Sequence, residues 1–182
     1  ARSCRRDLFD GRAWVVTPTD ETRPEVLDLV TAVATAAGAA VRRLPPDAHD
    51  RAVAAVSHVP QLAASLVAAR LEDLDEPAVA LAGQGLRDVT RIAASDPRLW
   101  VQILGANAAP VVEILRALRS DLDDVLHALE DPTAPGARRT IAETLAGGNA
   151  GVARIPGKHG QASHFSQIVV KVDDTPGELA RL

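Results

Sequence analysis

The chain has 182 residues, of which 47% are hydrophobic, 24% charged and only 2% aromatic. These proportions are typical of a globular protein whose core of small aliphatic side chains favours helices. The net charge of −4 argues against nucleic acid or an anionic membrane as a partner. The single cysteine excludes a disulfide framework. With no signal peptide and no apolar run near the ~20 residues that a membrane span needs, a cytoplasmic protein is predicted.

The first 45 residues have the pattern of a strand, a helix and a second strand. Residues 13–17 and 39–44 are predicted strands. The helix between them is predicted to begin after an N-cap at Thr22 and to end at Gly38. This order is typical of the end of a doubly wound α/β domain, and it is too short for a whole one. Because the chain contains no methionine, it is interpreted as an internal piece of a longer protein.

From residue 46 the pattern is mainly α. Asp47 is predicted to cap a helix that runs to about Glu72 and bends at Pro60, which lacks a backbone donor. A shorter helix is expected over residues 86–94. One long helix is predicted from residue 97 to 129, where apolar side chains keep a three-and-four spacing suited to packing against helices or a second copy of the chain.

The remaining residues are predicted to be mostly connecting segments. Residues 140–145 are expected to form a short helix, and a basic, glycine-containing linker follows from residue 147. Residues 165–172 alternate in the manner of a strand, and residues 173–179 resemble the start of a helix.

Arg91 is the first candidate binding residue. In a helix from residue 86, Asp88, Arg91 and Ser95 gather opposite an apolar face. The planar guanidinium offers a fork of donors that fits a carboxylate. The alternative is a solvated face with an Asp88–Arg91 pair of little energetic value.

Three polar residues interrupt the apolar pattern of the preceding helix. Ser57, His58 and Gln61 are spaced so that their side chains can converge near Pro60 as a pocket wall. A core histidine bonded to a carbonyl is an equally good interpretation of His58 alone. His49 lies nine residues earlier, on the opposite side of a regular helix, so no metal site is predicted.

Several segments together resemble the prephenate or arogenate dehydrogenase family of tyrosine biosynthesis. Residues 8–19 look like the end of its nucleotide-binding domain, and residues 165–179 are similar to the start of an ACT regulatory domain. The signatures that resemble its helical dimerisation domain are His49-Asp50, Ser57-His58-Val59-Pro60 and the block Gly83–Trp100. The similarity covers nearly the whole chain and occurs in the family's order.

The resemblance implies a domain plan and a reaction. Residues 1–45 would end the nucleotide-binding domain, 46–146 form the helical dimerisation and substrate-binding domain, 147–164 a linker, and 165–182 the start of the ACT-like domain. NAD or NADP would take hydride from ring C4 as carbon dioxide leaves and the ring becomes aromatic. The implied partners are a second copy of the chain, prephenate or arogenate, and an amino-acid effector such as tyrosine.

The resemblance also assigns residue roles. Arg91 would bind a substrate carboxylate, Asp88, Ser95 and Trp100 would shape its pocket, and His58 would build the wall. The catalytic histidine and the glycine-rich NAD loop are expected outside this chain. Isolated, the 182-residue chain is therefore expected to be inactive.

Gln61 departs from the family pattern, because many prephenate-using members carry histidine there. A neutral amide that both donates and accepts could bind the ammonium group of arogenate, where prephenate has a keto group. Two other functions remain open. One is a non-enzymatic helical dimerisation or amino-acid-sensing module; the other is a related β-hydroxyacid dehydrogenase, by analogy of fold alone.

Overall fold

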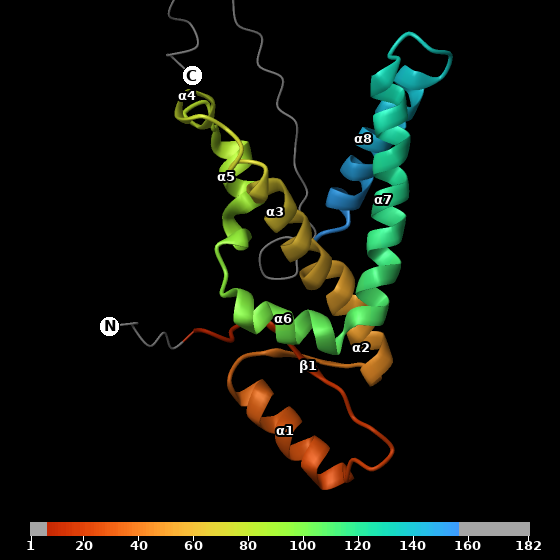
Figure 1. Ribbon diagram of the computed structural model, residues 1–182. Helices are drawn as coiled ribbons and strands as arrows, with labels where there is room; N and C mark the ends of the chain where they lie inside the picture. Colours follow the sequence, from red (N-terminus) through yellow and green to blue (C-terminus); the bar gives the residue numbers. More distant parts are fainter. Residues whose placement is uncertain (1–6, 157–182) are drawn as a thin grey trace, which may run out of the picture.

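The computed structural model describes residues 7–156. It begins with two short parallel strands, β1 (Ala13–Val16) and β2 (Ala40–Arg43), paired in register from Ala13 with Ala40 to Val16 with Arg43. Helices make up most of the rest (Figure 1). The predicted strand–helix–strand unit and the mainly α continuation are confirmed. The predicted ACT-like start lies outside the described residues.

Helix α1 (Pro24–Ala36) joins the two strands, and local residues set its ends. Its N-cap is Arg23, whereas the Thr22 hydroxyl accepts a hydrogen bond from the Thr19 N–H at 2.9 Å. The predicted cap at Thr22 is therefore wrong, because that hydroxyl closes the preceding turn instead. Gly38 follows the helix as predicted, with a φ of +83° that residues with a Cβ rarely adopt.

The long helix after β2 contains a π-helical turn. It consists of α2 (Pro46–Val53), the π turn η1 (Ala54–His58) and α3 (Val59–Ala69). The helix starts at Pro46 with Pro45 as N-cap, so Asp47 lies in the first turn and is not the predicted cap. The π turn ends two residues before Pro60, whose missing N–H removes one α-helical bond.

The chain then turns back along α3. The short helix α4 (Glu76–Val79) leads into α5 (Gln84–Thr90), which continues as the 3₁₀ turn η2 (Arg91–Ala93). Both α5 and η2 pack against α3. The helix predicted over residues 86–94 is confirmed to within a few residues.

The long helix predicted from residue 97 is two helices. Helices α6 (Pro97–Ala106) and α7 (Ala108–Glu130) meet at an angle of 96°. Asn107 lies at the break with φ −117° and ψ 34°, outside the helical range. Its side chain bonds the α2 segment, so a long-range contact ends α6 where the local apolar pattern continues.

Helix α8 (Ala137–Ala153) is much longer than the predicted helix over residues 140–145. The linker predicted from residue 147 is therefore wrong as far as Ala153, although that stretch contains three glycines. Packing against α7 stabilises the helix, since Ala128 and Ala137 are both buried. Tertiary contact here outweighs the low helix propensity of glycine.

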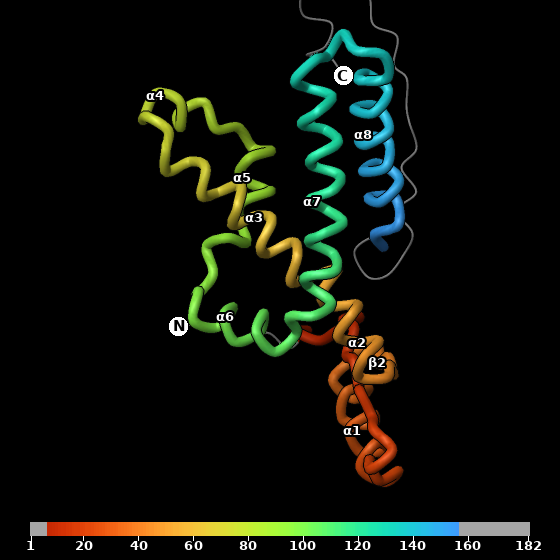
Figure 2. The backbone as a smooth tube through the Cα atoms, turned by 45° about the vertical axis from the view of Figure 1, so that its right-hand side comes forward, coloured from red at the N-terminus to blue at the C-terminus, as the bar shows by residue number. Residues whose placement is uncertain are grey.

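The main core lies where the long helix crosses α6 and α7. Ala54, Val59 and Val111 are buried there. The partly buried residues packed around them are Leu62, Leu104, Ile114 and Leu115. From this crossing, the α3–α5 pair and the α7–α8 pair extend as two diverging arms (Figure 1, Figure 2).

The continuous helix Pro46–Ala69 has the length and composition of a membrane span, and the bent pair α6–α7 would pass the same test if taken as one span. The prediction that no segment reaches this length is therefore wrong for the described residues, because the helix continues through Pro60. Core helices of soluble proteins pass the same test. This helix supplies three buried apolar residues, Ala54, Val59 and Ala64.

The turn between α7 and α8 contains a carboxyl group with a shifted pKa. Asp131 Oδ1 accepts hydrogen bonds from the Thr133 hydroxyl at 2.7 Å and from the Thr133 N–H at 3.0 Å. These bonds, the side-chain bond first, favour the carboxylate and hold the pKa of Asp131 below its ordinary value of 3.8.

We expect Thr133→Ala to raise the pKa of Asp131 toward 3.8 in an NMR titration. Because the folded-state pKa is lowered, the associated stability is present above the ordinary pKa and is lost as pH falls through the folded-state value. A pKa that stays equally low in the variant would show that the hydroxyl bond is not the main cause, because the backbone N–H bond remains in the variant.

Candidate functional site

A small cavity lies between α3 and α6, next to η2 and the segment that joins η2 to α6. Its volume is about 200 Å³. Three of the six predicted site residues, Gln61, Ser95 and Trp100, line it together. The other lining residues are Leu62, Ser65, Ala93, Pro97, Val101 and Leu104. The cavity thus has an apolar floor with a few polar groups, which is typical of a small-molecule site.

The turn before α6 places Ser95 and Trp100. The Asp96 side chain caps α6 by accepting a hydrogen bond from the Arg98 N–H at 2.9 Å, and Pro97 occupies the first helical position. The Ser95 hydroxyl donates to the Ile92 carbonyl at 2.5 Å. These local bonds fix the chain direction that brings Trp100 to the cavity.

Gln61 is buried, with 6% of its surface exposed. Its backbone carbonyl accepts a hydrogen bond from the Ser65 hydroxyl at 2.9 Å. Its side-chain amide has no partner among the described residues, yet none of their enclosed side-chain nitrogen or oxygen atoms is left unpaired. Gln61 thus lines the cavity, and its amide nitrogen and oxygen are not fully enclosed.

His58 is also buried, with 8% of its surface exposed. Its Nδ1 lies 3.2 Å from the side-chain nitrogen of Asn107. Its ring meets the ring of Trp100 edge-on, with centroids 6.1 Å apart and an interplanar angle of 82°. His58 therefore supports a cavity residue, and its hydrogen-bond partner is an amide rather than the carbonyl considered from the sequence.

Arg91 and Asp88 are exposed and do not line the cavity. The Asp88–Arg91 pair is not formed: Asp88 accepts a hydrogen bond from Gln84 Nε2 at 2.9 Å. Arg91 has no ion pair with any residue from 7 to 156 and opens the η2 turn, which packs against α3. Among the described residues its guanidinium is consequently unpaired, and it lies on η2, whose Ala93 lines the cavity.

The remaining polar candidates do not converge on this site. Ser57 is exposed, so it does not join His58 and Gln61 as the spacing suggested. His49 Nδ1 pairs with the neighbouring Asp50 carboxylate at 3.0 Å. In the part of the chain that the structure describes, no three His, Cys, Asp or Glu side chains are grouped to hold a metal ion.

The sequence analysis missed Asn107 and Ser65. Asn107 is 9% exposed and bridges the Asp50 carbonyl and His58. No periodic signal marks Asn107, because position 107 lies outside the apolar three-and-four spacing of residues 101, 104, 108 and 111. Ser65 follows Gln61 by one turn on α3 and lines the same cavity.

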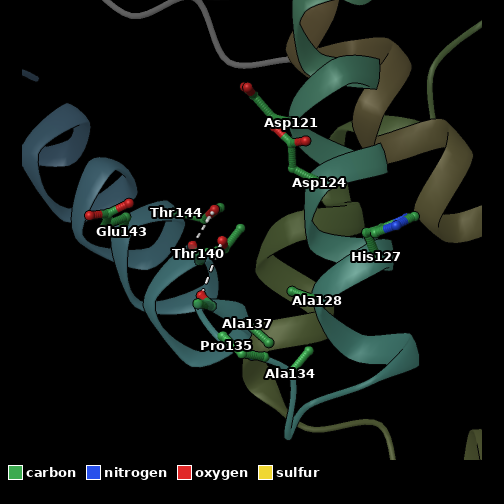
Figure 3. Close-up of a pocket in the computed structure, with 11 residues that line it drawn as sticks. Asp121, Asp124, His127, Ala128, Ala134, Pro135, Ala137, Thr140, Glu143 and Thr144 are labelled. Carbon is green, nitrogen blue, oxygen red and sulfur yellow. Dashed lines mark hydrogen bonds between the residues drawn. The ribbon is translucent and has the colours of Figure 1, made fainter.

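A larger cavity, about 560 Å³, lies between α7 and α8 near their connecting turn (Figure 3). Its polar lining includes Asp121, Asp124, His127 and Glu143. His127 and Glu143 point away from each other, and none of the predicted site residues is present (Figure 3). Size alone therefore does not identify the functional site.

The strand pair and the helical domain together superpose on solved structures of dehydrogenases. The family model described as "Prephenate dehydrogenase, dimerization domain" matches residues 45–143. The chain belongs to the prephenate dehydrogenase family.

Relatives of known sequence or structure agree with this assignment. The chain is 37% identical to the probable prephenate dehydrogenase NovF of Streptomyces niveus, over 99% of this chain and 52% of that protein. The prephenate dehydrogenase of Aquifex aeolicus in complex with hydroxyphenyl propionate and NAD+ superposes with a TM-score of 0.66 at 26% identity, covering 79% of this chain and 51% of that one. Synechocystis arogenate dehydrogenase superposes with a TM-score of 0.64 at 26% identity, covering 79% and 54%. The chain thus spans about half the length of these relatives.

Proposed function

We propose that the protein containing this chain oxidatively decarboxylates prephenate to 4-hydroxyphenylpyruvate or arogenate to tyrosine, with NAD or NADP. The observation that carries the proposal is the position of the cavity at Gln61, Ser95 and Trp100, inside the segment that matches the family model. A nicotinamide cofactor would accept the hydride while carbon dioxide leaves. The setting inferred for this biosynthetic reaction is the cytoplasm.

Arg91 is proposed to bind a substrate carboxylate. Its unpaired, exposed guanidinium can form two parallel hydrogen bonds with a carboxylate without first breaking an ion pair to a described residue. Trp100 and Ser95 would shape the pocket that receives the ring, and His58 would support its wall through Trp100. Asp88 does not line the cavity; it is proposed to support the pocket from α5, where it accepts a hydrogen bond from Gln84.

The cofactor's phosphates have no evident site among the described residues. The connection from β1 to α1 contains no glycine, whereas a dinucleotide loop needs glycines to let the backbone approach the pyrophosphate. We therefore place the NAD or NADP loop outside residues 7–156. The contribution proposed for this chain is to bind and orient the substrate.

A homodimer through the helical domain is also proposed. Exposed leucines at 118, 122, 126 and 129 form a stripe along α7. Their four-and-three spacing repeats on one helix face, as in helices that pack against a partner helix. The family model's description as a dimerisation domain supports the same arrangement.

An amino-acid effector such as tyrosine is proposed for residues 165–182, which resemble the start of an ACT domain.

The neutral amide of Gln61 supports the hypothesis that the enzyme tolerates or prefers arogenate as its substrate. Its amide carbonyl can accept a hydrogen bond from an ammonium group, while the same amide can donate to a keto oxygen. Because the amide is buried and lacks a partner among the described residues, leaving it unpaired in a complex would cost about 1–3 kcal/mol. A substrate with an ammonium group would satisfy its carbonyl.

We expect Gln61→His to lower the ratio of kcat/KM for arogenate to that for prephenate by about tenfold, the equivalent of one hydrogen bond. The measurement is formation of reduced nicotinamide by the intact gene product with both substrates in parallel. Ser65→Ala, which changes a neighbouring cavity residue but leaves the Gln61 amide, is the matched control. An unchanged ratio in Gln61→His would remove Gln61 from substrate discrimination.

A further inference from the structure

Asn107 holds together three parts of the fold that carry the site. Its side-chain nitrogen lies 2.8 Å from the Asp50 carbonyl oxygen and 3.2 Å from His58 Nδ1. It also occupies the break between α6 and α7. One buried amide therefore connects the start of the long helix, the π turn and the helix that carries Trp100.

The Asp50 carbonyl fixes the orientation of the Asn107 amide. A carbonyl oxygen can only accept a hydrogen bond, so the NH₂ group of Asn107 must face it. The amide has two N–H donors, and the second meets His58 Nδ1. His58 Nδ1 must then be the acceptor, which leaves the ring proton on Nε2.

The second ring nitrogen of His58 is not fully enclosed. Nε2 has no hydrogen-bond partner among the described residues, and no enclosed side-chain nitrogen of those residues is unpaired. Nε2 therefore reaches accessible space although the residue is only 8% exposed. The Nε2–H group is therefore a hydrogen-bond donor with a fixed direction, because the ring is buried and packs edge-on against Trp100.

The π turn makes this bridge possible. In a regular α-helix, eight residues advance about 80° beyond two full turns, which would separate position 50 from position 58 around the axis. A π turn advances less per residue. The turn Ala54–His58 thus brings the Asp50 carbonyl and the His58 ring to the same side, where one amide reaches both.

We propose that Asn107 is a positioning residue that locks His58 in the Nε2–H tautomer, so that His58 donates a hydrogen bond to an oxygen of the bound substrate. The role in substrate binding rests on the proposed function; the tautomer does not. Asn107 touches no reacting atom in this account and acts through His58 alone.

The first test reads the tautomer of the wild-type protein directly. Histidine ¹⁵N chemical shifts of the intact protein distinguish the two tautomers, and His58→Gln assigns the resonance. The expected result is a protonated Nε2 and an unprotonated Nδ1 in His58. A proton on Nδ1 would overturn the proposal.

Two substitutions then separate positioning from packing. Asn107→Asp puts a carboxylate oxygen opposite His58 Nδ1, so it should move the proton to Nδ1 and lower kcat/KM by about 10- to 100-fold, the usual effect of losing the group that orients a functional histidine. Asn107→Ala removes the partner without supplying an acceptor, so neither tautomer is held by this bond and the loss of activity should be smaller than in Asn107→Asp. Equal losses in the two variants with the same tautomer would show that Asn107 only supports the fold.

If the wild-type protein turns over neither substrate, the proposed function fails while the ¹⁵N shifts still decide the tautomer.

Discussion

Arg91→Ala is expected to lower kcat/KM of the intact protein about 100-fold with its preferred substrate. Two hydrogen bonds from a guanidinium to a carboxylate are together worth about 3 kcal/mol, which corresponds to about two factors of ten in rate. Arg91→Lys should recover only part of the loss, because an ammonium keeps the charge without the planar fork. The effect should appear mainly in KM if the carboxylate is held equally in the ground and transition states.

The matched control is Arg70→Ala on the same arm of the molecule. Arg70 is an exposed arginine at the end of α3, paired with Asp73 at 3.8 Å. An exposed pair of this kind contributes little to stability, so neither activity nor melting temperature should change appreciably. Wild-type kinetics in Arg91→Ala would show that the exposed guanidinium is an ordinary solvated side chain.

Ala54→Leu is expected to destabilise the protein by about 1–3 kcal/mol, the usual effect of overpacking a filled core. Ala54 has 0% of its surface exposed and lies in the core with Val59 and Val111. A larger side chain there must push the π turn away from α7. For a chain of this size, each kcal/mol lowers the melting temperature by about 2–4 °C.

Ala55→Leu is the control for that experiment. Ala55 is the next residue in the same π turn and is exposed, so its substitution should change stability by no more than about 0.5 kcal/mol. Both variants should be unfolded by denaturant at equal protein concentration, because association stabilises the folded state by mass action. Equal stability of the two variants would contradict the crossing of the long helix over α7.

Local patterns predicted the elements whose ends depend on nearby residues. Gly38 ends α1 because its backbone adopts a left-handed φ, and proline opens α6 as its fixed φ allows. The strand–helix–strand unit followed from periodicity and short connections. In each of these cases the determining residues lie within one turn of the structure that they determine.

Long-range contacts decided what the sequence did not reveal. The apolar spacing from residue 97 to 129 is continuous, yet the bond from Asn107 to the Asp50 carbonyl, 57 residues away, divides it into two helices. The glycines in α8 predicted a linker, but packing against α7 keeps that stretch helical. Neither contact leaves a periodic signal in the sequence.

The candidate site likewise combines residues that could be predicted from the sequence with residues whose role depends on the fold. Gln61 was predicted from its polar side chain in an apolar helix, and Trp100 from the family resemblance; the fold brings both to one cavity. Ser57 was predicted to converge with His58 and Gln61 and is exposed, because the π turn changes the helical phase on which the prediction relied. Asn107 gains its importance only from the fold that places it beside His58.

The most direct test is to incubate the intact protein with NAD or NADP and with prephenate or arogenate in turn, and to measure reduced nicotinamide and released carbon dioxide together. Oxidative decarboxylation predicts equal amounts of the two products with at least one substrate. Folded protein that yields neither product from either substrate would contradict the assignment of this chain to a dehydrogenase.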